Sequence, residues 1–160
     1  MSKKIEKTVT LDILTWKELG NDIQSLVLKA KASAENAHAP YSNFMVGAAL
    51  LLENGEIFTA NNQENVSFPV GICAERVVLS YVQANFPDII PTKIAIAAKR
   101  RNQTEYATVT PCGICRQTIS EYEQKFKRPI EVYMLTPKGE VLKAPSMDDL
   151  LPFKFSDING

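Results

Sequence analysis

The 160-residue sequence is poor in the side chains that most often bind transition metals, with one histidine and three cysteines. A closed site of four cysteines is therefore impossible within one chain. The single histidine, His38, lies in a different predicted element from any cysteine and is expected to be a surface residue. An odd number of cysteines cannot all pair in disulfides, and it suits a reducing compartment where thiols remain free for metal. We therefore expect a cytoplasmic protein.

The sequence also lacks an excess of charge, because 18 basic residues balance 18 acidic ones. This balance gives no bulk attraction to a polyanion, so neither nucleic acid nor an acidic membrane surface is expected as a partner. No apolar run is long enough to span a bilayer, and no secretory signal is visible. No repeat, low-complexity segment or linker divides the chain. We expect a single domain over residues 1–160, with residues 1–14 as an N-terminal extension.

Apolar residues make up 45% of the chain, and their spacing predicts helices alternating with strands. Thr15 and Glu18 have the spacing of a capping box, and apolar residues at intervals of three and four then predict a helix to about residue 38. Asn54-Gly55 predicts a tight turn between two strands. Strands are expected at 46–52, 57–60, 93–98, 130–135 and 141–142, and further helices near 73–86, 111–126 and 146–151. This order predicts an α/β layered domain with a mixed sheet.

Residues 1–14 have two interpretations. Val9, Leu11 and Ile13 alternate with polar residues, which is typical of a short edge strand. A loosely docked arm is equally compatible with the pattern.

All three cysteines lie in two short segments, Cys73-Ala74-Glu75-Arg76 and Pro111-Cys112-Gly113-Ile114-Cys115. Three thiolates fill three positions of a tetrahedral zinc site and leave the fourth free for water. Both segments begin predicted helices, whose N-terminal dipoles favour thiolates. Glu75 can face the open position as an acid or base if Cys73 stands at the helix cap.

The residues alone leave simpler interpretations open. A C-x-x-C pair can be redox-active or half of a structural zinc site, and a lone Cys73 can be a buried apolar residue. Arg76 can be a solvated helix charge, although its positive charge would also offset that of the thiolates. Phe44 fits a core position on spacing alone, and Asn62 and Glu64 fit an ordinary loop.

Six sequence segments, taken together, are more specific for a protein family than any one of them alone. They are Cys73-Ala74-Glu75-Arg76, Pro111-Cys112-Gly113-Ile114-Cys115-Arg116-Gln117, Ala39-Pro40-Tyr41-Ser42-Asn43-Phe44, Val46-Gly47-Ala48-Ala49-Leu50, Asn62-Gln63-Glu64-Asn65 and Leu150-Leu151-Pro152. In these segments the chain resembles the zinc-dependent cytidine deaminases of the three-cysteine, homotetrameric type, over roughly residues 15–155. The resemblance implies a three-layer α/β/α sandwich with a mixed five-stranded sheet.

The resemblance also implies an activity: hydrolytic deamination of cytidine and deoxycytidine to uridine and deoxyuridine, with release of ammonia, in pyrimidine salvage. One zinc ion per subunit would be bound by Cys73, Cys112 and Cys115, and Glu75 would shuttle protons from the zinc-activated water. The partners would be a small pyrimidine nucleoside and further copies of the same chain, with Phe155 reaching a neighbouring subunit's site.

The substrate contacts implied by the resemblance involve four residues. Phe44 would pack against the pyrimidine ring, Asn62 and Glu64 would hydrogen-bond the ribose, chiefly its 3′-hydroxyl, and Ala74 would also contact the substrate. Arg76 would hydrogen-bond the thiolates.

Three alternatives remain at this point. A related deaminase of a nucleoside antibiotic would be expected to have a different loop in place of Asn62-Gln63-Glu64-Asn65. A non-catalytic zinc-stabilised domain would need neither an open fourth position nor Glu75. Deaminases of polynucleotides mostly have histidine where Cys73 stands, and the neutral net charge does not favour such a substrate.

Overall fold

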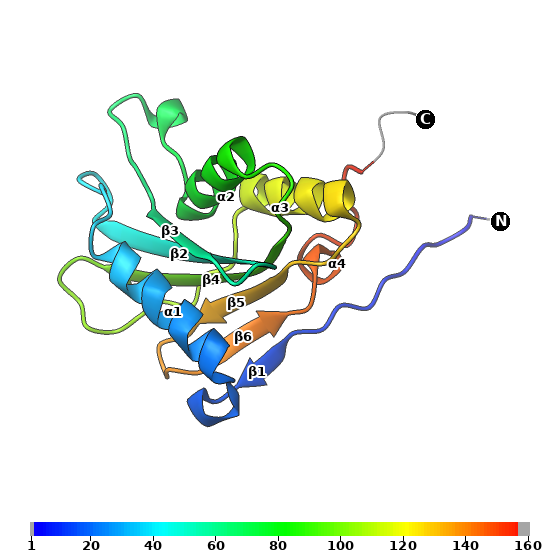
Figure 1. The fold of residues 1–160 in the computed structure, drawn as a ribbon, viewed down its shortest axis with the longest axis horizontal. Coiled ribbons are helices and arrows are strands. Elements are labelled where there is room, and N and C mark those ends of the chain that lie inside the picture. Colours follow the sequence, from blue (N-terminus) through cyan, green and yellow to red (C-terminus); the bar gives the residue numbers. More distant parts are fainter. Residues whose placement is uncertain (1, 157–160) are drawn as a thin grey trace.

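A computed structural model describes residues 2–156 of the chain, which form an α/β fold around one mixed, six-stranded sheet (Figure 1). The strand order is β1-β6-β5-β4-β2-β3. Only β4 and β5 run parallel, and the other neighbours are antiparallel. The strands are β1 (Asp12–Leu14), β2 (Phe44–Leu52), β3 (Ile57–Asn61), β4 (Pro91–Arg100), β5 (Glu131–Leu135) and β6 (Val141–Ala144).

The expected count of five strands is wrong, because β1 adds a sixth strand at the edge. Asp12, Ile13 and Leu14 pair antiparallel with Lys143, Leu142 and Val141 of β6. The N-terminal segment is thus an edge strand only over these three residues. Residues 2–11 have no regular secondary structure, although the Thr10 amide donates a hydrogen bond to Asp149 Oδ1 (3.2 Å).

Helices lie on both faces of the sheet (Figure 1). The apolar side of α1 packs against the face that carries Ala49, Ala95 and Ala97. The alternate residues of the same strands, such as Ala48 and Leu50, belong to the core cluster that α2, α3 and α4 complete on the other face. The helical segments are η1 (Trp16–Glu18), α1 (Asn21–Ala34), η2 (Phe68–Val70), α2 (Ala74–Asn85), α3 (Gly113–Phe126) and α4 (Met147–Leu150). Within the described residues, none of these helices has the length and apolar composition that crossing a bilayer requires.

The capping box at Thr15 and Glu18 is present, but it does not start the long helix. The Glu18 carboxylate accepts hydrogen bonds from the Thr15 amide and hydroxyl, both at 2.7 Å, and together they close the 3₁₀ turn η1. Helix α1 begins separately after Gly20 and ends at Ala34. The predicted helix over 15–38 was too long because the apolar spacing continues through the turn and through Ala37, which is buried outside the helix.

A buried carboxylate, Glu123, joins the end of α3 to the segments that follow it. Its Oε1 accepts hydrogen bonds from the amides of Ile130 (2.8 Å) and Met147 (3.0 Å), and the side chain is 8% exposed. Burial raises the pKa of Glu123 above its ordinary value. The carboxylate therefore satisfies two backbone donors but is itself costly to ionise.

We expect Glu123→Ala to lower the free energy of unfolding by about 2–4 kcal/mol, because two buried N–H groups lose their acceptor. Glu123→Gln keeps an acceptor oxygen and should lose much less. The pH dependence separates the two effects. Since the pKa of the folded state exceeds that of the unfolded chain, wild-type stability falls as the pH rises between those two values, and Glu123→Gln should lack this fall. Urea unfolding of the three proteins from mildly acidic to neutral pH measures the free energy of unfolding and its pH dependence. If this free energy depended on pH in the same way for wild type and Glu123→Gln, the raised pKa of Glu123 would be contradicted.

Candidate active site

The three cysteines, far apart in the sequence, meet at the N-terminal ends of two helices. Cys73 is the N-cap residue of α2, and Cys112 is the N-cap residue of α3, with Cys115 in the first turn. The Sγ atoms of Cys73 and Cys112 are 3.8 Å apart, and those of Cys112 and Cys115 are 3.5 Å apart. All three sulfur atoms lie within 4.8 Å of one another. Helix α3 begins at Gly113, two residues after the predicted start near residue 111, so Pro111 precedes the cap and lies outside the first turn.

These separations fit one zinc ion. Tetrahedral coordination with Zn–S bonds of about 2.3 Å places neighbouring sulfur atoms about 3.8 Å apart. Hydrogen bonding from Cys115, then from Cys112, together with the positive charge of Arg76, lowers the pKa of Cys73 to about 6. The interaction with Cys73, together with burial, raises the pKa of Cys115. One thiolate is therefore already favoured near neutral pH, and a cation at the centre would favour the others.

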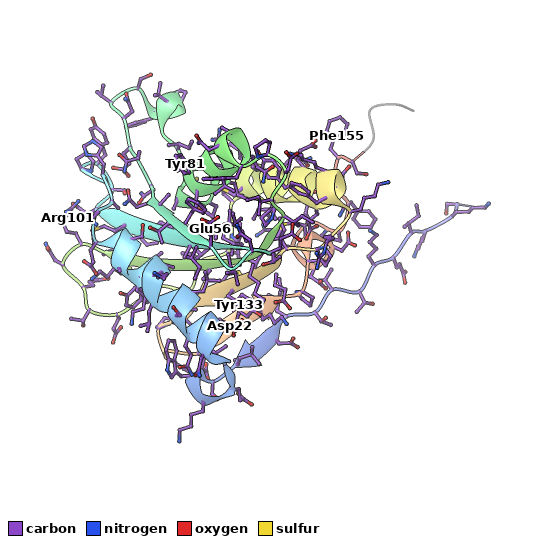
Figure 2. All side chains as sticks on the ribbon, in the orientation of Figure 1. Asp22, Glu56, Tyr81, Arg101, Tyr133 and Phe155 are labelled. Atoms are coloured by element: carbon purple, nitrogen blue, oxygen red, sulfur yellow. The ribbon has the colours of Figure 1, made fainter. Side chains whose placement is uncertain are left out.

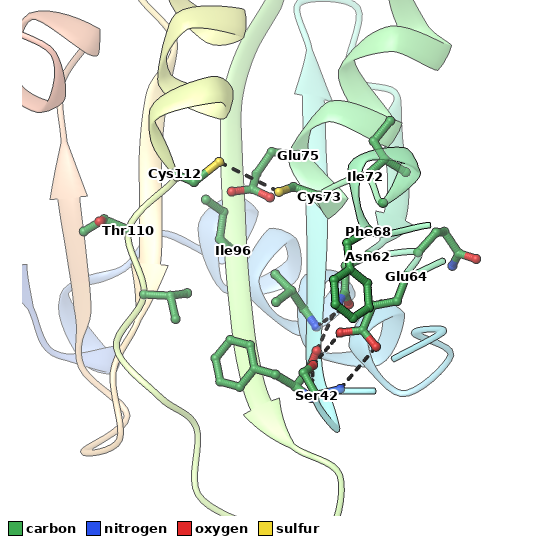
Figure 3. Close-up of a pocket in the computed structure, with 15 residues that line it drawn as sticks. Ser42, Asn62, Glu64, Phe68, Ile72, Cys73, Glu75, Ile96, Thr110 and Cys112 are labelled. Atoms are coloured by element: carbon green, nitrogen blue, oxygen red, sulfur yellow. Dashed lines mark hydrogen bonds between the residues drawn. The ribbon is translucent and has the colours of Figure 1, made fainter. Parts of the chain in front are cut away.

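Glu75 lies beside the sulfur atoms without belonging to their cluster. It follows Cys73 by two residues in the first turn of α2, and Figure 3 shows its carboxylate next to the sulfur atoms of Cys73 and Cys112. The side chain is 5% exposed, and burial raises the pKa of its carboxyl to about 7. A carboxyl with a pKa near neutrality can both accept and donate a proton at that pH.

A cavity of about 450 Å³ opens in front of Glu75 and two of the cysteines (Figure 3). Three predicted substrate-binding residues, Phe44, Asn62 and Glu64, line it. Ala74, the first residue of α2, is not part of this lining, and its side chain is fully buried in the core between α2 and the sheet. Its contact with the substrate remains a prediction. The wall also contains residues that the sequence analysis did not name as substrate contacts: Ser42, Val46 and Gln63, which lie in the quoted motifs, and Phe68, Gly71, Ile72, Ile96, Val109 and Thr110.

Backbone hydrogen bonds fix the segment that carries Asn62 and Glu64. The His38 amide donates to the Asn62 carbonyl (3.1 Å), and the Glu64 amide donates to the His38 carbonyl (2.8 Å). Gln63 and Ile72 exchange two further bonds of 3.0 Å, which tie this segment to the residue before Cys73. The sugar-binding candidates and the cysteine cluster are therefore held at a fixed separation by main chain.

The Asn62 amide spans the beginning of β2. Its Oδ1 accepts from the Val46 amide (2.8 Å), and its Nδ2 donates to the Phe44 carbonyl (3.0 Å). Asn62 thus positions the wall that contains Phe44, in addition to any contact with a ligand.

Two arginines lie near the cysteine cluster, and they act differently. Arg76 lowers the pKa of Cys73 through its charge, and within residues 2–156 no hydrogen bond joins its guanidinium to a thiol. Arg116, for which the sequence predicts no role, donates to the Pro111 carbonyl (2.7 Å), the Thr110 hydroxyl (2.8 Å) and the Leu150 carbonyl (2.8 Å). It therefore anchors the loop that ends at Cys112 against the end of α4.

Phe155 lies outside the cavity. Its side chain, labelled in Figure 2, is 68% exposed, and its carbonyl accepts a hydrogen bond from Gln117 Nε2 (2.8 Å). Phe155 also borders a groove along α3. Its expected contact with a neighbouring subunit remains a prediction.

Comparison with known proteins decides the family. The family model described as "Cytidine and deoxycytidylate deaminase zinc-binding region" matches residues 21–128. This chain belongs to that family. The fit of the cysteine cluster and the family's zinc-binding region together identify the cofactor as Zn²⁺, and the protein is a zinc-dependent hydrolase of the cytidine deaminase family.

Relatives cover most of the chain. A cytidine deaminase of Sporosarcina psychrophila is 36% identical over 136 residues, which is 84% of this chain and 92% of that protein. A cytidine deaminase of Halalkalibacterium halodurans is 33% identical over 137 residues, 84% of this chain and 95% of that protein. The crystal structure of cytidine deaminase from Burkholderia pseudomallei superposes with a TM-score of 0.69 at 36% identity, covering 82% of this chain and 97% of that one. The deaminase fold is thus confirmed, with the sixth strand lying in the N-terminal extension.

Proposed function

We propose that this deaminase hydrolyses cytidine and deoxycytidine to uridine and deoxyuridine with release of ammonia, a reaction of pyrimidine salvage. The observation that carries the proposal is the position of Glu75, buried beside three clustered thiols at the end of a nucleoside-sized cavity. Cys73, Cys112 and Cys115 would bind the zinc ion, which supplies a coordinated water whose pKa is lowered toward about 7.

Glu75 would carry the protons of the reaction. Its carboxylate accepts the proton of the attacking water and delivers it to N3 of the pyrimidine, which makes C4 electrophilic. The oxygen of the water bonds to C4. Glu75 then accepts the proton of the new C4 hydroxyl and transfers it to the amino group. The C4–N bond breaks, ammonia leaves, and the C4 oxygen becomes the carbonyl oxygen of the uracil ring. A carboxyl whose pKa lies near neutrality suits both directions of transfer.

The cavity favours a nucleoside over a nucleotide. The described residues that line it include Glu64 and Glu75 and no lysine, arginine or histidine, so a 5′-phosphate would meet no cationic side chain there. Phe44 would pack against the base, and Glu64 would accept a hydrogen bond from the sugar. The positive charge of Arg76 would stabilise the thiolates. The hydrogen bonds of Arg116 would hold the loop that ends at Cys112 in place.

Absorbance assays on the purified, metal-analysed protein test this function directly. We expect loss of cytidine and deoxycytidine with matching ammonia release, and little turnover of cytosine, cytidine monophosphate or a cytosine-nucleoside antibiotic. Preference for the antibiotic would replace the proposal with the related-deaminase alternative. A zinc-loaded protein that releases no ammonia from any of these compounds would refute it.

Removal of zinc should abolish turnover and lower the melting temperature. A ligand present at about 1,000 times its Kd stabilises the folded state by about 4 kcal/mol, which corresponds to roughly 10 °C for a chain of this size. Calorimetry before and after chelation, followed by addition of zinc or magnesium, measures both effects. Zinc and not magnesium should restore them, and a stripped protein with unchanged melting and turnover would contradict the metal assignment.

We further propose that the chain self-associates, as a homotetramer. Large apolar side chains are exposed on the loop around η2 (Val66, Phe68 and Val70), and Ile114 and Phe155 are exposed beside the groove along α3. A second copy is a fitting partner for such surfaces in a chain without net charge. Light scattering after gel filtration gives the mass, and a monomer at micromolar concentration would rule the tetramer out.

A further inference from the structure

Ser42 connects two of the residues that face the substrate cavity. Its hydroxyl donates a hydrogen bond to Glu64 Oε1 (2.5 Å) and accepts one from the Phe44 amide (3.0 Å). Figure 3 shows Ser42 and Glu64 side by side at the end of the cavity away from the cysteines. Ser42 therefore lies between the carboxylate expected to bind the sugar and the ring expected to bind the base.

The hydrogen bonds of Glu64 leave little freedom to its carboxylate. Oε2 accepts from the amides of Tyr41 (2.8 Å) and Ser42 (3.3 Å), while within residues 2–156 Oε1 accepts only from the Ser42 hydroxyl. A carboxylate accepts about four hydrogen bonds, so one position remains, and it lies on Oε1. The bond from Ser42 also lowers the pKa of Glu64, which keeps the group ionised and able only to accept.

Side chains hold both the backbone amide and the backbone carbonyl of Phe44. The Ser42 hydroxyl holds its amide, and Asn62 Nδ2 holds its carbonyl (3.0 Å). Between Ser42 and Phe44, Asn43 has a φ of +56°, a left-handed conformation that asparagine adopts more readily than most residues other than glycine. The surrounding hydrogen bonds maintain this tight turn, so the direction in which Ser42 points is defined.

We propose that Ser42 is a positioning residue for substrate binding, which directs the free acceptor position of Glu64 Oε1 toward one hydroxyl of the nucleoside sugar. The inference rests on the proposed function of the same cavity. Because the contact lies far from the reacting C4 atom, it stabilises the bound substrate and the transition state alike. Loss of Ser42 should therefore raise KM and leave kcat nearly unchanged.

The test compares Ser42→Ala with wild type on cytidine and on its 2′-deoxy, 3′-deoxy and 2′,3′-dideoxy analogues. We expect Ser42→Ala to reduce kcat/KM for cytidine about tenfold or more, since a hydrogen bond to a charged group is affected. For the analogue that lacks the hydroxyl bound by Glu64, and for the dideoxy compound, the difference between wild type and variant should be much smaller than for cytidine, with only the loss of the bond to the Phe44 amide remaining. Ser42→Thr, which keeps the hydroxyl, should restore the wild-type ratio between cytidine and the dideoxy analogue.

Ratios between substrates are measured on one preparation, so they do not depend on the fraction of enzyme that is folded. If Ser42→Ala slows all four substrates by the same factor, Ser42 has only a structural role and the proposal is overturned. A double variant also distinguishes the positioning role from a structural role. If Ser42 acts through Glu64, adding Ser42→Ala to Glu64→Ala should cause no further loss of kcat/KM. Wild-type turnover of cytidine tests the proposed function separately, so failure of one can be told from failure of the other.

Discussion

Glu75→Gln is expected to lower kcat for cytidine by at least about 10²–10⁴, the range typical of a positioned acid or base. Glutamine has nearly the same size and can occupy the same buried space beside Cys73 and Cys112, but it cannot accept and return a proton. The variant should therefore still bind cytidine and zinc. Single-turnover deamination, equilibrium binding of cytidine and zinc analysis of the same sample measure the three properties.

The matched control is Glu6→Gln, the same chemical change on an exposed residue of the N-terminal segment. It should turn over cytidine as wild type does. Glu75→Gln with zinc bound and with kcat near that of wild type would remove Glu75 from the mechanism, and loss of zinc from the variant would show instead that Glu75 supports the metal.

Gly47→Ala is expected to lower the free energy of unfolding by roughly 3 kcal/mol or more. Gly47 lies in β2 where the strand passes directly under α1. A Cβ atom there would lie 2.0 Å from the Ala30 carbonyl oxygen and 2.5 Å from the Ala34 amide nitrogen. Both are backbone atoms of the helix, so relief requires α1 to move away from the sheet and give up part of its buried contact.

Gly113→Ala provides the comparison for stability. A Cβ atom at Gly113 would have no heavy atom within 4 Å, and the position is the first residue of α3, where alanine is a better helix former than glycine. Chemical unfolding of both variants should give a large loss for Gly47→Ala and none for Gly113→Ala. Equal stabilities would mean that α1 does not pack on β2 as closely as described.

The residue types and the local patterns were predictable from the sequence. The residue types of the three cysteines and Glu75 are enough to predict zinc binding and proton transfer. The predicted Asn54-Gly55 turn joins β2 and β3, with Gly55 at a φ of +87°. Cys73 is the N-cap residue of α2, as expected if Glu75 is to face the open position of the zinc ion. Such features depend on residues within a few positions of one another, so their hydrogen bonds and backbone angles can be inferred locally.

The tertiary structure alone decided the contacts between residues distant in sequence. The pairing of β1 with β6, which made the sheet six-stranded, joins residues about 130 positions apart, and nothing near Asp12 indicates its partner. Arg116 reaches Leu150, and Ser42 reaches Glu64, 34 and 22 positions away. Burial and hydrogen-bond partners at these places are set by how α1, the sheet and α3 pack together. The sequence by itself therefore determined which atoms could bind zinc and transfer protons. The packing of the helices against the sheet determined which contacts hold those atoms in position relative to the substrate cavity.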